Sequence, residues 1–150
     1  MDADAINLLR TKAPEILAKQ PVMLAYVYGS VVEGNTLPSS DVDIGLVFGP
    51  VCGLSAYDRT QIEFLIATEI ERSCHIREAD VRSIDNAPLA VRGVVVTEGV
   101  LLYSRDEEFR VEYEVNTRKR YFDFLPVLGM MRDSFFRQVQ EEGLIHGKAG

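Results

Sequence analysis

Two aspartates stand at the start of an apolar segment that runs from Asp41 to Phe48. Side chains of a β-strand alternate between its faces, so Asp41 and Asp43 share one face while Val42 and Ile44 point to the other. Neighbouring carboxylates repel each other, and burial raises their pKa unless a cation lies between them. A hard divalent cation such as Mg²⁺ resolves this conflict, because it binds one or two protein carboxylates and fills its other positions with water and phosphate oxygens.

A second motif, Gly29-Ser30, directly follows another apolar segment. Glycine allows the backbone to approach a ligand closely. If a helical turn begins after Ser30, its free N–H groups form an anion site to which the hydroxyl adds a donor. Phosphate held by backbone amides beside a metal held by two aspartates indicates a nucleoside triphosphate site.

The two motifs together, Gly29-Ser30 and Asp41-Val42-Asp43 with ten residues between them, resemble the signature of the nucleotidyltransferase superfamily that includes DNA polymerase beta and kanamycin nucleotidyltransferase. The segment 77–110 is similar to the corresponding stretch of the MntA-type antitoxins of HEPN–MNT toxin–antitoxin pairs. The likeness covers about residues 22–110. It implies a minimal nucleotidyltransferase fold, an α/β (α+β) structure in which helices cover mainly one face of a small mixed sheet and a helical part follows.

The resemblance also implies roles for the site residues. Asp80, in Ala-Asp-Val of the next expected strand, becomes the third carboxylate, and Glu78 on the same face is the reserve candidate. Asp41, Asp43 and Asp80 would hold Mg²⁺, expected as two ions, and Gly29 and Ser30 would hold the phosphates of ATP. The implied reaction is in-line transfer of AMP, with Asp80 helping to deprotonate the attacking hydroxyl. Taken without the resemblance, Asp80 is equally a solubility charge on an edge strand.

The acceptor implied by the antitoxin group is a tyrosine of a cognate HEPN RNase toxin. Aromatic residues of the C-terminal part could dock such a partner, although ordinary core packing explains most of them: Tyr113, Tyr121, Phe122, Phe124, Phe135 and Phe136. Two alternatives stay open, an antitoxin that neutralises its toxin by binding alone and a small-molecule nucleotidyltransferase of the aminoglycoside type. The first alternative rests on Glu33, because many family members carry a basic residue at this place and a carboxylate would repel phosphate.

Hydrophobic periodicity and turn residues predict the order of the elements. Segment 89–99 is ambiguous, and we expect a helix there because Asp85-Asn86 precedes it as a cap and Gly99 closes it. Asp106 is expected to cap the last helical region, which should break near Pro126 and Gly129. The expected elements are a helix at 2–12 that Pro14 kinks or restarts, strands at 22–28 and 41–48, a helix at 56–74 with a Ser55/Asp58 capping box, a strand at 76–84, the helix at 89–99, a strand at 100–103, and helices from 106 to about 143.

Composition places the chain among ordinary globular proteins. Of its 150 residues 47% are hydrophobic, and the formal net charge of −7 argues against direct nucleic-acid binding and suits a basic partner. We expect a single domain over 1–142, with a catalytic core at about 22–104, a helical part at 106–142 and a flexible tail at 143–150. Cys52 and Cys74 fit reduced thiols, no segment is long enough to span a membrane, and a cytoplasmic location is expected.

Overall fold

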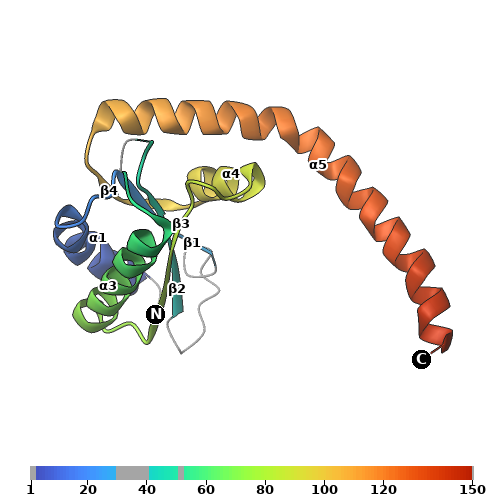
Figure 1. Ribbon diagram of the computed structural model, residues 1–150, viewed down its shortest axis with the longest axis horizontal. Coiled ribbons are helices and arrows are strands. Elements are labelled where there is room, and N and C mark those ends of the chain that lie inside the picture. The colour runs from blue at the N-terminus through green and yellow to red at the C-terminus, as the bar shows by residue number, and fades with distance from the viewer. Residues whose placement is uncertain (1–2, 30–40, 51–52, 150) are drawn as a thin grey trace.

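The chain folds into a four-stranded sheet with helices on both faces, followed by one long helix (Figure 1). A computed structural model describes residues 3–29, 41–50 and 53–149, with side chains described from residue 6 to residue 141 outside these gaps. The elements, in chain order, are α1 (Ala3–Ala18), β1 (Leu24–Tyr28), β2 (Asp41–Val47), α3 (Ala56–Cys74), β3 (Glu78–Ser83), α4 (Leu89–Glu98), β4 (Val100–Ser104) and α5 (Glu107–Ala149).

The sheet has the strand order β3-β2-β1-β4 and is mixed. β1 pairs antiparallel with both β2 and β4, whereas β2 and β3 are parallel. A parallel pair needs a crossover connection, and α3 provides it. The predicted mixed sheet is confirmed, and its parallel pair is the one that brings the two predicted carboxylate strands together.

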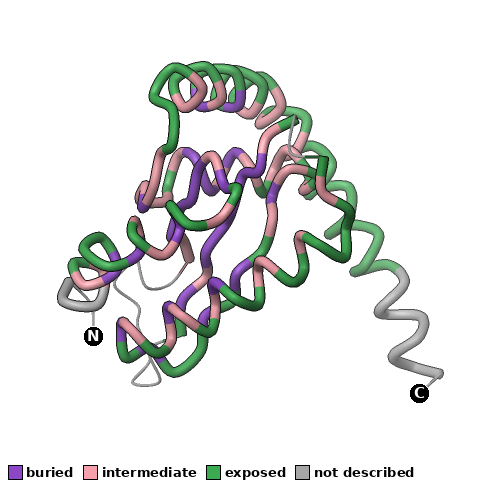
Figure 2. The backbone as a smooth tube through the Cα atoms, turned by 60° about the vertical axis from the view of Figure 1, so that its left-hand side comes forward, coloured by how far each residue is buried: buried purple, intermediate pink, exposed green. Residues whose placement is uncertain are grey.

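One face of the sheet is covered by α1 and α3, and the main core lies between them and the strands (Figure 1). β2 contributes Val42, Ile44 and Leu46 to this core, as the alternation predicts. α3 begins with the predicted capping box, in which the Ser55 hydroxyl accepts from the Asp58 N–H and the Asp58 carboxylate accepts from the Ser55 N–H. The tube in Figure 2 shows this buried centre surrounded by exposed helix surfaces.

α4 and the first turns of α5 pack over the other face of the sheet, around a second core cluster centred on Leu24, Tyr26 and Val95. The prediction that helices cover mainly one face is therefore wrong, because both faces carry apolar residues that need to be covered. The close contact of the two helices depends on Gly93, because a Cβ there would lie 2.2 Å from the ring of Tyr121. Segment 89–98 is therefore a helix, as expected. Its β-branched residues are tolerated because Val95 and Val96 are buried by this packing.

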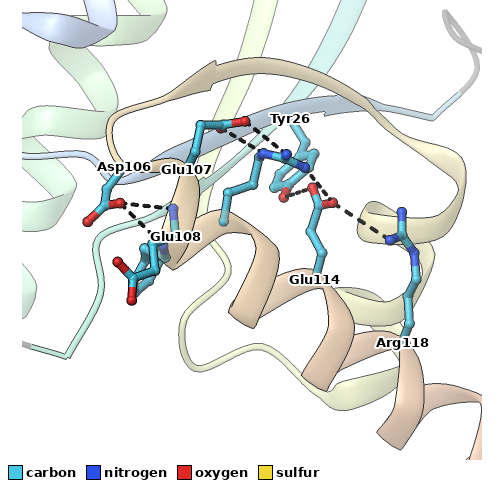
Figure 3. Close-up of polar contacts among 8 residues, drawn as sticks. Tyr26, Asp106, Glu107, Glu108, Glu114 and Arg118 are labelled. Carbon is cyan, nitrogen blue, oxygen red and sulfur yellow. Dashed lines mark hydrogen bonds and ion pairs between the residues drawn. The ribbon is translucent and has the colours of Figure 1, made fainter.

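A buried carboxylate, that of Glu114, lies at the centre of a charged network where α5 crosses the sheet (Figure 3). The carboxylate of Glu114, which is 8% exposed, accepts a hydrogen bond of 2.8 Å from the hydroxyl of Tyr26. Arg110 approaches the same carboxylate to 3.0 Å and Arg118 to 3.7 Å. Two cations and one hydroxyl thus compensate a carboxylate that would otherwise be costly to bury.

Three local predictions were wrong. α1 continues through Pro14 to Ala18, because Ala13 and Leu17 are fully buried and their packing outweighs the hydrogen bond that proline removes. α5 runs unbroken through Pro126 and Gly129 and past residue 143 to Ala149, although its axis changes direction in Figure 1. Asp85 does not cap α4; it accepts hydrogen bonds from the N–H groups of Phe48 and Gly49.

The other caps follow the sequence more closely. The Asp106 carboxylate accepts from the N–H groups of Glu108 and Phe109 at the start of α5, as predicted (Figure 3). Among the described residues no helix is long and apolar enough to cross a membrane. Cys74 is buried as a free thiol, and Cys52 lies outside the described residues.

Candidate active site

The three predicted carboxylates come from adjacent parallel strands. Asp43 on β2 is the direct partner of Asp80 on β3, and Asp41 is the partner of Glu78. Val42 and Ile44 are buried against α1 and α3, so the intervening aspartates project from the opposite face of the sheet. Asp80 lies on that face too, because Ala79 and Val81 are buried in the same core. The structure thus places Asp41, Asp43, Asp80 and the reserve candidate Glu78 on one face.

Gly29, directly after β1, approaches the same carboxylates. Its φ of +88° is a conformation that other residues rarely adopt, and a Cβ there would lie 2.8 Å from Oδ2 of Asp43. The backbone therefore passes close to the Asp43 carboxylate directly after β1, and only a residue without a Cβ fits there. Ser30 and Glu33 lie outside the described residues, so the predicted phosphate cradle is described only at Gly29.

The environment of Asp43 disfavours the negative charge of its carboxylate. Partial burial raises the pKa of its carboxyl, the charges of Asp80 and Asp41 raise it further, and Arg82 opposes the shift. Among the described residues no donor forms a hydrogen bond with the Asp43 carboxylate, so the described part of the protein does not compensate its charge in this way. The site therefore favours a cation beside Asp43.

Arg82 is a member of this site that the sequence reasoning missed. Its Nε lies 2.9 Å from Oδ1 of Asp80, and both side chains are well exposed. Alternation along β3 carried the signal, because Arg82 follows Asp80 by two residues and therefore shares its face. The interaction also holds the pKa of the Arg82 guanidinium above its usual range.

Tyr28, the last residue of β1, is the second residue that was missed. It is the antiparallel partner of Asp43, and its ring lies beside Gly45, where a Cβ would be 3.4 Å from Cε1 of Tyr28. Partial burial raises the pKa of its hydroxyl, and the charges of Asp43 and Asp80 raise it further. Tyr28 therefore lines the floor of the site as a neutral phenol.

The residue types fit a magnesium site, although the arrangement is not a closed one. Carboxylates on neighbouring strands are suitable ligands for Mg²⁺, and the side-by-side placement of Asp43 and Asp80 brings two of them to one place. Within the described part of the chain, however, no three carboxylate, histidine or cysteine groups are gathered tightly enough to hold one ion. The hydrogen bond between Asp80 and Arg82 engages the third carboxylate.

The larger hollows of the described surface lie elsewhere. One of about 710 Å³ is lined by Met23, Phe48 and Phe109, at the end of β2 opposite to Asp41. The chemistry of the carboxylates, rather than the size of a hollow, identifies the candidate site, because segment 30–40 beside them is outside the described residues.

A family comparison agrees with this geometry. The family model described as "Polymerase beta, Nucleotidyltransferase" matches residues 11–108, which span the sheet, α3, α4 and all of the carboxylates named above. The chain belongs to the polymerase beta nucleotidyltransferase family. This nucleotidyltransferase places its two aspartates and Gly29 where the sequence motif predicted them, and the resemblance inferred from the motif is confirmed. A search of curated proteins finds no match.

Solved structures of similar fold include chains of toxin–antitoxin complexes. A complex with AMP-PNP contains a chain that is 21% identical, with a TM-score of 0.57 over 89% of this nucleotidyltransferase and 97% of that chain. A complex of a tri-AMPylated HEPN toxin with an MNT antitoxin from Shewanella oneidensis gives 18% identity and a TM-score of 0.60 over 87% and 98% of the two chains. An MntA–HepT complex gives 18% identity and a TM-score of 0.61. At these identities the likeness shows the nucleotidyltransferase fold, and the predicted fold class is confirmed.

Proposed function

We propose that this nucleotidyltransferase transfers AMP from ATP to a tyrosine of a HEPN-type RNase toxin and thereby acts as its antitoxin. The observation that carries the proposal is the register of Asp43 with Asp80, with Gly29 held against Asp43. Membership of the nucleotidyltransferase family supports transfer of a nucleotide. The AMP-PNP complex and the tri-AMPylated toxin complex of similar fold support the choice of adenylate and of a protein acceptor.

Each site residue has a role in this proposal. Gly29 and Ser30 bind the phosphates of ATP, and Asp41, Asp43 and Asp80 bind Mg²⁺, with two ions expected. Mg²⁺ held by these carboxylates would neutralise the charge that develops on the leaving pyrophosphate. Asp80 orients the acceptor hydroxyl and helps to remove its proton, because it lies at the open edge strand where an acceptor has access.

The surface of α5 supports a protein partner. In the first half of the helix, Tyr113, Thr117 and Tyr121 lie on the side that faces the sheet and α4. Beyond Pro126 the helix extends away from the sheet (Figure 1), and large apolar side chains are exposed there with no described part of the chain to cover them. These exposed side chains are Val127, Met130, Met131, Phe135, Phe136 and Val139.

An exposed apolar surface of this kind is typical of a protein-binding site. We propose that the toxin docks on the exposed apolar side chains of this segment of α5. The acidic net charge of −7 favours a basic partner. The prediction that core packing explains most of the C-terminal aromatic residues is therefore wrong for the exposed ones and holds nearer the start of α5. Tyr113 packs in the second core cluster, whereas Phe122, Phe135 and Phe136 are exposed.

The decisive experiment incubates the protein with labelled ATP, Mg²⁺ and a purified HEPN toxin encoded beside it. We expect label on the toxin with the wild-type protein, loss of at least about a hundredfold in rate with Asp43→Asn, and no change with Glu15→Gln. Glu15 is a suitable control because it is an exposed carboxylate on α1, on the other side of the sheet. A parallel incubation contains an aminoglycoside in place of the toxin. Transfer of label to the aminoglycoside but not to the toxin would instead favour a small-molecule nucleotidyltransferase.

Neutralisation by binding alone is the second candidate function. The observation that favours it is the hydrogen bond of Asp80 to Arg82, which engages the third carboxylate instead of leaving it open to a metal. Toxin inhibition that persists in the Asp41→Asn/Asp43→Asn variant, without any label transfer by the wild type, would establish this alternative. Inhibition that disappears in the same variant would exclude it.

A further inference from the structure

The face of the sheet that carries Arg82 has an excess of negative charge, and the proposed function does not explain how a negatively charged substrate binds there. Three carboxylates, Asp41, Asp43 and Asp80, share its face of the sheet, and the proposed substrate is a polyanion. Besides metal ions, a triphosphate site needs protein cations. Arg82 is the only cationic residue in the described strands β1, β2 and β3, which carry this site.

We infer that Arg82 binds the triphosphate of the nucleotide, and that Asp80 holds its guanidinium in the metal-free protein. This inference rests on the proposed function and names a further substrate-binding residue of the same site. It predicts two states of one side chain. In the first, Arg82 neutralises Asp80. In the second, Asp80 would hold a metal ion and the guanidinium of Arg82 would bind the phosphates.

The position of Arg82 makes both states accessible. Arg82 is the parallel-strand partner of Gly45 and lies on the same face as Asp80 and Asp43, one residue pair further along the strands. The space above Gly45 itself is filled by Ile84, 3.1 Å from where a Cβ would lie. Tyr28 lies beside Gly45 on the other side, so Arg82 and Tyr28 flank the same small position. The Nε of Arg82 lies 2.9 Å from Oδ1 of Asp80, and Asp43 is the direct strand partner of Asp80, so Arg82 lies near both carboxylates.

The pairing with Asp80 is of a kind that a metal ion can displace. The side chain of Arg82 is 73% exposed and that of Asp80 is 47% exposed. Exposed ion pairs of this type contribute little to stability, because water screens them. A guanidinium released from a carboxylate is also well suited to phosphate, because its planar donors bind both groups in the same two-point geometry.

The first test measures Mn²⁺ binding to the metal-free protein without nucleotide, by calorimetry or electron paramagnetic resonance. If Arg82 competes with the metal for Asp80, Arg82→Ala should bind Mn²⁺ several-fold more tightly than the wild type. Arg72→Ala is the matched control, because Arg72 is also 73% exposed and also forms an ion pair with a carboxylate, that of Glu69, on α3. Unchanged or weaker Mn²⁺ binding by Arg82→Ala would overturn the inference.

The second test measures AMP-PNP binding at saturating Mn²⁺. We expect Arg82→Ala to bind AMP-PNP roughly tenfold more weakly and AMP about as well as the wild type, because only the triphosphate analogue reaches the guanidinium. Arg82→Lys should bind AMP-PNP with an affinity between those of Arg82→Ala and the wild type. Arg72→Ala should bind AMP-PNP as tightly as the wild type. Equal loss for AMP and AMP-PNP would contradict the inference and indicate a general disturbance of the site.

The two proposals fail in different ways. Binding of AMP-PNP that depends on Arg82, with no transfer of label to the toxin, would leave the role of Arg82 intact and reject the proposed reaction. Transfer of label that is unaffected by Arg82→Ala, together with unchanged AMP-PNP affinity, would reject the role of Arg82 and retain the reaction. A wild-type protein that binds no nucleotide would overturn both.

Discussion

Asp43 and Asp80 are direct partners on adjacent parallel strands, so the sheet itself holds two carboxylates side by side. Neighbouring strands lie about 4.8 Å apart, a distance at which like charges repel. The backbone hydrogen bonds of the sheet and the burial of Ile44 and Val81 on its other face oppose this repulsion. The pair therefore stores an unfavourable interaction that a bound cation would relieve.

Asp43→Asn should stabilise the metal-free protein at neutral pH. The pKa of the Asp43 carboxyl is raised in the folded state above its ordinary value, by burial first and then by the charge of Asp80. The folded state therefore holds the proton more tightly than the unfolded state, so ionisation costs stability once the pH rises through the folded pKa. Below the unfolded value both states are protonated and the cost vanishes.

Thermal unfolding in a metal chelator measures this effect. The melting temperature of Asp43→Asn should exceed that of the wild type at pH 7, and the difference should disappear below about pH 4. With Mg²⁺ added, the order should reverse, since only the wild type gains from the metal. A variant that is less stable than the wild type at pH 7 in chelator would show that Asp43 has a stabilising partner.

Gly29→Ala should destabilise the protein and weaken nucleotide binding. The backbone φ of +88° disfavours alanine, and its Cβ would lie 2.8 Å from Oδ2 of Asp43. We expect a loss of about 1–2 kcal/mol from the backbone conformation alone, with a further loss from this contact. Denaturant unfolding and AMP-PNP titration measure the two effects.

Gly53→Ala separates the two causes. Gly53 also has a positive φ, of +63°, but a Cβ there meets nothing within 4 Å. This control should show the conformational loss without any change in nucleotide affinity. Equal effects at both positions would mean that the approach of Gly29 to Asp43 has no importance for the site.

Tyr26→Phe should remove the only hydroxyl that the described residues donate to the buried carboxylate of Glu114. A buried acceptor that loses its donor costs about 1–3 kcal/mol in the free energy of unfolding. The retained contacts of Glu114 with Arg110 and Arg118 favour the lower part of this range. Tyr57→Phe, at a tyrosine that is 71% exposed, should leave the free energy of unfolding unchanged in the same denaturant titration.

Two glycines of helical segments should respond to alanine in opposite directions. At Gly93 the added Cβ would overlap the ring of Tyr121, so Gly93→Ala should cost about 1–3 kcal/mol as α4 and α5 move apart. At Gly129, inside α5, a Cβ meets nothing within 4 Å, and alanine should stabilise the helix by about 0.5–1 kcal/mol. Thermal unfolding of both variants checks the signs, and a loss at Gly129 would argue against a continuous α5.

Local signals predicted most elements well, and they failed where packing outweighs propensity. The capping box of Ser55 and Asp58 fixed the start of α3, because both partners are close in sequence. Pro14 did not end its helix, since the burial of Ala13 and Leu17 compensates the hydrogen bond that proline removes. Pro126 did not end α5 either, but the side chains that follow it are exposed, so burial does not explain this continuity. Asp85 was wrongly assigned as a cap because its partners, the N–H groups of Phe48 and Gly49, are distant in sequence.

The sequence by itself determined the chemistry of the candidate site. Alternation along one strand placed Asp41 and Asp43 on a common face, and the adjacent glycine motif indicated phosphate binding, because both features depend only on local geometry. Only the tertiary structure decided which residues meet. The parallel pairing of β2 and β3 set Asp80 beside Asp43, and the same register placed Arg82 next to Gly45. Strand register depends on contacts across the whole sheet, so no local pattern could have revealed that Asp80 lies beside Asp43, although the spacing of Asp80 and Arg82 along one strand was a local signal for their contact.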